Sequence, residues 1–100
     1  MFVSKLVHVE DGVINVVTTT KKPSNSISVT AIWVEEEIDG EWEAVLEIDH
    51  PEIAGVGSFF STSATIDMSK LNYSSMFRVG VTMDADGYTE SWHSESFKTE

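Results

Sequence analysis

Histidines, acidic residues beside glycines and serines are the side chains in this sequence whose types could do chemistry. The three histidines, His8, His50 and His93, lie far apart. Zinc sites in small domains usually take at least two ligands that are close in sequence. We therefore predict ordinary solvent-facing histidines and no metal site.

The stretch "DADGYTE" (Asp84 to Glu90) offers the oxygen donors Asp84, Asp86 and Glu90. A calcium loop of the EF-hand type needs further ligands at fixed spacing and flanking helices, and neither is evident. Asp and Gly are the residues that a tight hairpin turn requires. We predict a turn here and no bound calcium.

Catalysis is not predicted. The serines form no G-x-S-x-G step, and the expected strands bring no serine, histidine and acid together. Paired carboxylates are numerous, but acid–base catalysis needs a cleft that separates their pKa values, and a domain of 100 residues has little room for one. We expect a protein that is not an enzyme and uses no cofactor.

The composition fits a single folded domain covering residues 1–100, with 41% hydrophobic residues and no cysteine. Six lysines and arginines against 17 acidic residues give a net charge of −11, which disfavours nucleic-acid binding. The acidity suits either solubility or a basic partner surface. No signal peptide or membrane-spanning run is recognisable, so we expect no membrane association and a cytoplasmic location, or a virion if a phage encodes the chain.

Short runs rich in valine, isoleucine, threonine and aromatics alternate with turn signals, which predicts an all-β, seven-stranded antiparallel β-sandwich. The segments Lys21–Ser26 and Asp49–Gly57 are expected to be loops. Asp-Gly steps mark three of the turns. The expected strands cover residues 2–9, 13–20, 27–37, 41–48, 60–68, 76–83 and 88–97.

Strand alternation predicts which residues face the core. In the first hairpin, the Asp11-Gly12 turn pairs Val9 with Ile14 and Val7 with Val16. In the last strands Ala64, Ile66, Phe77, Val79, Val81 and Met83 are expected to face inward, and Gly80 outward.

The third and fourth strands are expected to pair Trp33 with Leu46, Glu36 with Glu43 and Glu37 with Trp42. Ala31 and Trp33 would face inward. Trp92 is expected in the core beside Val79; a shorter turn would instead set it over Gly80 on the outer face.

Two stretches resemble the fibronectin type III family and its immunoglobulin-like relatives. "TAIWVEEEIDGEWEAVLEI" (Thr30 to Ile48) is similar to the family's third and fourth strands, and Ala64 to Thr99 is similar to its last three. Phe77 falls where the family places a corner tyrosine, but it has no hydroxyl. Free-standing sandwiches of this kind resemble decoration, tail or fibre proteins of bacteriophages.

Glu36 and Glu43 are expected to face each other across the hairpin of the third and fourth strands, which raises the question of what this hairpin does. Outward-facing aliphatic residues ringed by acids would form a contact surface for a protein partner. We expect a non-enzymatic structural or adhesive module that docks onto a larger assembly, with repeated basic virion subunits or a further copy of the chain as partner. The expected interface residues are Ile32, Val34, Val45, Glu36, Glu43 and Trp42.

The alternative is a soluble binder or inhibitor of an enzyme or glycan. It would present loops at one end of the sandwich, as antibody domains do. The residues expected to bind in that case are Lys21, Lys22, Asp84, Asp86 and Tyr88.

Overall fold

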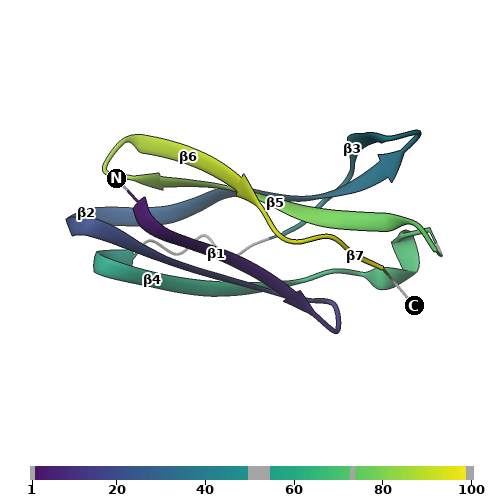
Figure 1. Ribbon diagram of the computed structural model, residues 1–100. Helices are drawn as coiled ribbons and strands as arrows, with labels where there is room; N and C mark the ends of the chain where they lie inside the picture. The colour runs from purple at the N-terminus through teal and green to yellow at the C-terminus, as the bar shows by residue number, and fades with distance from the viewer. Residues whose placement is uncertain (1, 50–54, 73, 99–100) are drawn as a thin grey trace.

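The computed structural model describes residues 2–49, 55–72 and 74–98, and most of them lie in β-strands. Figure 1 shows the strands and a single short 3-10 turn. Their bounds are β1 Phe2–Glu10, β2 Val13–Ile38, β3 Glu41–Glu47, β4 Gly55–Thr65, η1 Met68–Lys70, β5 Met76–Ala85, β6 Tyr88–His93 and β7 Phe97–Lys98.

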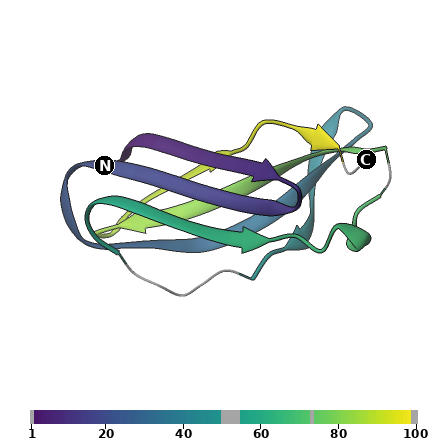
Figure 2. The same ribbon diagram turned by 90° about the horizontal axis from the view of Figure 1, so that it is seen from below.

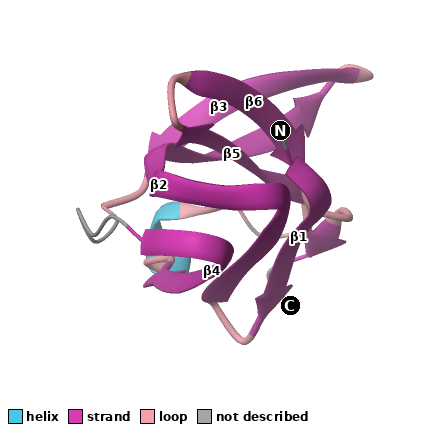
Figure 3. Ribbon diagram, turned by 90° about the vertical axis from the view of Figure 1, so that its left-hand side faces the viewer, coloured by secondary structure: helices cyan, strands magenta, loops and turns pink. Residues whose placement is uncertain are grey.

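The strands form one curled antiparallel sheet, built around β2. The first part of β2, residues 13–20, pairs with β1 on one side and β4 on the other. The second part, residues 27–38, pairs with β3 and β5, and β5 also pairs with β6 and β7. Because β2 runs through both halves, the halves face each other across one core (Figures 2 and 3).

The all-β antiparallel class is therefore confirmed, although the strands are divided differently from the prediction. The segment Lys21–Ser26, expected to be a loop, is extended and joins the expected second and third strands into β2. Ser24 within it is buried and pairs with Gly57 of β4. The expected last strand is split into β6 and β7. Residues 50–54 of the expected loop Asp49–Gly57 lie outside the described residues.

All three Asp-Gly steps form two-residue hairpin turns. This length was predicted for the first two steps. The third turn was expected to have four residues, Asp84 to Gly87, but β5 continues to Ala85, so only Asp86 and Gly87 form the turn. The aspartates have positive φ angles of 50°, 54° and 51°, and the glycines 77°, 84° and 86°. This pair of left-handed residues defines the type I′ turn, whose twist matches that of the flanking strands. The predicted pairs Val9–Ile14 and Val7–Val16 follow from the first turn and are confirmed.

The predicted core positions in β5, at the end of β4 and directly after β4 are also confirmed. Phe77, Val79, Val81 and Met83 are fully buried, and Ala64 and Ile66 are buried with them. Trp92 packs against this core, as expected by default, but it lies opposite Val81. Its ring centroid is 5.8 Å from that of Phe2, so the last hairpin contacts β1.

The predicted orientation of β2 is wrong. Ile32 and Val34 are buried, with 3% and 0% of their surfaces exposed, while Trp33 lies on the outer face. The cause is a register shift against β5 between Val29 and Ala31. One extra residue, Thr30, reverses which side of the strand faces the core, because side chains alternate with period two.

A second register shift separates β2 from β3. Val34 pairs with Leu46 and Glu35 with Ala44, which leaves Val45 as the bulged residue. Beyond the bulge, the predicted pairs Glu36–Glu43 and Glu37–Trp42 are confirmed. Before it, the predicted pair Trp33–Leu46 is wrong by one residue, since Trp33 pairs with Glu47.

Candidate functional site

The outer face of β2, β3, β5 and β6 carries a cluster of polar and aromatic side chains. We call it the Trp33 cluster; its members are Trp33, Glu35, Trp42, Arg78 and His93. Trp33 and Glu35 share this face because they are two residues apart on one strand. The antiparallel register places Arg78 opposite Glu35, so the cluster depends on the pairing of β2 with β5.

Gly80 makes room for the indole of Trp33. The two residues are direct partners across β2 and β5, and the ring covers the bare glycine backbone. A Cβ atom on Gly80 would lie 2.2 Å from Cε2 of Trp33. His93 also pairs with Gly80, and its ring meets that of Trp33 in a T-shaped contact with centroids 6.1 Å apart.

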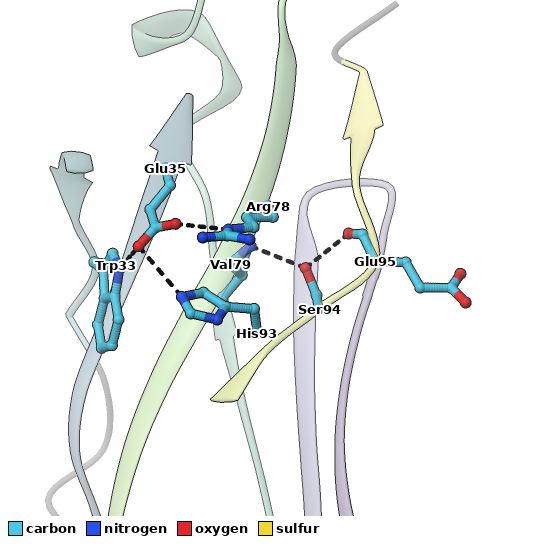
Figure 4. A network of polar contacts seen from close by, with 7 residues as sticks. All are labelled: Trp33, Glu35, Arg78, Val79, His93, Ser94 and Glu95. Carbon is cyan, nitrogen blue, oxygen red and sulfur yellow. Dashed lines mark hydrogen bonds and ion pairs between the residues drawn. The ribbon is translucent and has the colours of Figure 1, made fainter. Parts of the chain in front are cut away.

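Glu35 lies at the centre of the cluster (Figure 4). The indole Nε1 of Trp33 donates to its Oε2 at 2.7 Å, and Nε of Arg78 donates to its Oε1 at 2.6 Å. Nε2 of His93 lies 3.3 Å from Oε2. Only 13% of the Glu35 side chain is exposed, so these contacts replace water around the carboxylate.

The pKa of Glu35 is lowered by these contacts. Burial by itself raises the pKa of the carboxyl group, but the hydrogen bonds from Trp33 and Arg78 and the charges of His93 and Arg78 outweigh it. Glu35 therefore stays ionised at neutral pH. A carboxylate held in this state is poorly suited to act as a general acid.

Arg78 also anchors Trp42 of β3. Its guanidinium carbon lies 4.5 Å from the centroid of the Trp42 ring, which is the geometry of a cation–π contact. The side chain thus links Glu35 on β2 to Trp42 on β3. The cluster fixes the base of the hairpin formed by β2 and β3.

Ser94 fixes the neighbouring end of β6 (Figure 4). The backbone N–H of Val79 donates to the Ser94 hydroxyl at 2.9 Å, and that hydroxyl donates to the carbonyl of Glu95 at 2.9 Å. Ser94 is the residue directly after β6, and its hydroxyl accepts a hydrogen bond from the backbone N–H of Val79 in β5. His93 is held against Trp33 by this arrangement.

Glu36, predicted to lie on an interface, is turned toward the core face and 7% exposed. The amide of Asn72 donates to its carboxylate at 3.0 Å. Hydrogen bonds from Asn72 and from the Ser75 hydroxyl lower its pKa. The opposed pair Glu36–Glu43 is therefore relieved, because Asn72 and Ser75 stabilise the charge of Glu36 while Glu43 stays exposed.

The remaining acids project from the hairpin. Eight of the 17 acidic residues lie between Glu35 and Asp49, a stretch with no lysine or arginine, which we call the acidic hairpin. Six of them are exposed and have no ion pair among the described residues. They are Glu37, Asp39, Glu41, Glu43, Glu47 and Asp49.

A groove of about 500 Å³ lies where β3 leaves β2. The small side chains of Ala31 and Ala44 leave space there, with Trp33 among the residues beside them. The carboxylates of Glu47 and Asp49 belong to the same groove. Val45, which follows Ala44 in the sequence, has an apolar side chain that is 43% exposed.

The residues predicted for an interface are thus only partly brought together. Val45 and Glu43 are exposed, Trp42 is half-buried beneath Arg78, and Ile32, Val34 and Glu36 are buried. Buried side chains cannot touch a partner without unfolding the sheet. The predicted apolar centre of the interface is therefore absent.

The residues of the loop alternative do converge at one end of the fold. The carboxylate of Asp86 accepts hydrogen bonds from the backbone N–H groups of Asn25 and Ser26, each at 3.0 Å. Asp84 accepts from the Gly87 N–H at 2.9 Å. Asp86 therefore holds the turn against β2, and Asp84 stabilises the turn itself, which supports the predicted turn. The other three residues, Lys21, Lys22 and Tyr88, are exposed.

Among the residues that the structure describes, no group of three or more potential ligands could hold a metal ion. His8 is exposed and lies 3.7 Å from Glu10, whereas His93 belongs to the Trp33 cluster. His50 lies outside the described residues. Within the described ranges, none of the helical structure is long and apolar enough to cross a membrane.

Sequence reasoning missed Trp33, Glu35, Arg78 and His93 as members of one cluster. The available signal was Gly80, an outward-facing glycine in an otherwise bulky strand, which calls for a large ring above it. No protein-family model, no curated protein and no solved structure matches this chain. The resemblance to fibronectin type III domains therefore stays a prediction.

Proposed function

We propose that this chain is a non-enzymatic binding module that docks through its acidic hairpin onto a basic surface of a larger protein assembly. The six exposed carboxylates without an ion pair in the described structure carry this proposal. Like charges gathered on one hairpin repel one another, and a basic partner surface removes that repulsion.

The rigid base of the hairpin supports the same proposal. Glu35, Arg78 and Trp42 tie β2, β5 and β3 together, so the exposed acids are presented on a fixed support. A preorganised surface loses less conformational entropy on binding. The low pKa of Glu35 and its three donors also favour a structural role over acid–base catalysis.

For the fold, we propose a seven-stranded sandwich of the fibronectin type III or immunoglobulin-like type. The order of neighbours, β1–β2–β4 in one half and β3–β2–β5–β6 in the other, supports it. The class of assembly suggested by this resemblance is a bacteriophage virion, with the chain as a decoration, tail or fibre component. Presentation of loops is less well supported, because Asp84 and Asp86 bind the chain itself.

Carbodiimide cross-linking tests the docking proposal, since the reagent joins carboxylates to lysine side chains in contact. The chain is incubated with an extract of the cells or particles that contain it, and linked peptides are identified by mass spectrometry. We expect Glu37, Glu41 and Glu43 to be linked to lysines of one abundant protein.

A triple variant, Glu37→Gln, Glu41→Gln and Glu43→Gln, should lose the complex. A matched triple variant of exposed acids outside the hairpin, Glu10→Gln, Asp11→Asn and Glu95→Gln, should keep it. Docking that survives the first variant, or is lost equally in both, contradicts the proposal.

A further inference from the structure

β4 is an edge strand with an unusual composition. Among the described residues it pairs with β2 alone, and Figure 2 shows β1, the first part of β2 and β4 side by side in that order. Its 11 residues, Gly55–Thr65, include no charged residue and no proline. A free edge presents unpaired backbone N–H and C=O groups to any other strand, and proteins usually guard such edges with charges, proline or bulges.

The other edges of the sheet are guarded. β1 carries Lys5, whose ammonium pairs with Glu90 of β6 at 3.0 Å, and β3 carries three glutamates. Of the seven described strands, β4 is the one without a charged side chain. It also exposes apolar surface, since Val56 is 76% and Phe59 61% exposed.

We propose that β4 is a dimerisation edge, onto which β4 of a second copy of the chain adds in antiparallel orientation. The distribution of charge selects a second copy as the occupant. A chain of net charge −11 repels its own copies, and most strongly where the acidic hairpins would meet. Two β4 strands meet without opposing like charges, and an antiparallel pair of identical strands has the two-fold symmetry of a closed dimer.

The pairing centres on Phe59 to Ser63. At the end of β4, Thr65 lines a groove with three acids, Glu47, Asp49 and Asp67, and one base, Lys70. The net charge of this groove is negative, so two copies that met there would repel each other. The exposed outer-face side chains before that point, Phe59, Ser61 and Ser63, are uncharged. Cross-strand contacts of this kind stabilise antiparallel pairs.

Sedimentation velocity over roughly 1 to 500 µM protein tests the proposal, because this range covers the dissociation constants of weak and moderate dimers. The wild-type chain should pass from monomer to dimer as its concentration rises. Ser61→Lys should weaken dimerisation about fivefold, since two lysines then face each other near the two-fold axis. Ser4→Lys places the same charge on the exposed outer face of β1 and should leave the dissociation constant unchanged.

Circular dichroism and thermal unfolding of both variants establish that they are folded. Both substitutions add a positive charge, which reduces the net negative charge of the chain and by itself favours association. Weaker dimerisation of Ser61→Lys therefore cannot be caused by the change in net charge. A wild-type chain that stays monomeric at the highest concentration overturns the proposal. Equal weakening by Ser4→Lys and Ser61→Lys overturns the assignment of the edge to β4.

Discussion

Replacing Gly80 by alanine tests the packing of the Trp33 cluster most sharply. The added Cβ would lie 2.2, 2.3 and 2.6 Å from Cε2, Cζ2 and Nε1 of Trp33. Ordinary contact between carbon atoms is about 3.5 Å, so the indole has to move away by roughly 1.3 Å. Such a movement pulls Nε1 away from Glu35, to which it donates at 2.7 Å.

Two losses add up in the alanine variant. Forcing an extra carbon into a close-packed site costs about 1–3 kcal/mol. Losing a hydrogen bond to the ionised Glu35 costs about 1.5–3 kcal/mol more, reduced where water replaces the indole. We expect Gly80→Ala to lower the free energy of unfolding by about 2–4 kcal/mol.

Urea unfolding of four proteins provides the assay: wild type, Gly80→Ala, Trp33→Ala and the double variant. The three atoms nearest the new methyl group all belong to the Trp33 indole, and Trp33→Ala removes them. Alanine also restricts the unfolded chain more than glycine does. Gly80→Ala should then change from destabilising to neutral or stabilising by about 0.5 kcal/mol. Equal effects of Gly80→Ala in both backgrounds would refute the stacking of Trp33 over Gly80.

Three further predictions test other parts of the structure. Glu35→Gln should lower the free energy of unfolding by about 1–3 kcal/mol at pH 7. Because the pKa of Glu35 is lowered in the folded state, this difference from wild type should shrink as the pH falls below about 4. A difference that does not change with pH contradicts the prediction. Asp86→Gly should speed the hydrogen exchange of the backbone amides of Asn25 and Ser26, which donate to the Asp86 carboxylate. Asp39→Gly changes the same position of another type I′ turn and should leave the exchange of these two amides unchanged. Val34→Ala should cost about 2 kcal/mol in urea unfolding and Val45→Ala less than about 0.5, and the reverse order would contradict the orientation of β2.

The hairpins and the core of β5 were predictable from sequence, because short-range rules determine them. An Asp-Gly step requires two left-handed residues, and each such step is a turn in the structure. The alternation of Phe77, Val79, Val81 and Met83 with small or polar residues is unbroken, so its buried side is unambiguous.

The orientation of β2 was not predictable by alternation alone. Ile27 and Val29 face the core at odd positions, and Ile32 and Val34 face it at even positions. The change occurs at the register shift between Val29 and Ala31, and a bulge leaves little trace in sequence. Uniform alternation from Ala31 places Trp33 inward, which its large apolar area also favours, and this prediction was wrong.

The Trp33 cluster depends on long-range pairing. Glu35 and Arg78 are 43 residues apart, and only the β2–β5 register after the bulge brings them together. An error of one residue in that register would move the Glu35 side chain to the opposite face. The acidic hairpin itself was visible in the sequence, but the burial of Glu36 depends on the contact with Asn72.

Nuclear Overhauser effects between side-chain protons test the central structural claim most directly, since both the outer cluster and the exposed hairpin depend on the direction that β2 faces. The structure predicts contacts between the methyl groups of Val34 and Val79, and between the indole protons of Trp33 and the Hα protons of Gly80. Contacts of the Trp33 indole with the buried methyl groups of Val79 and Val81, together with a solvent-exposed Val34, would contradict it.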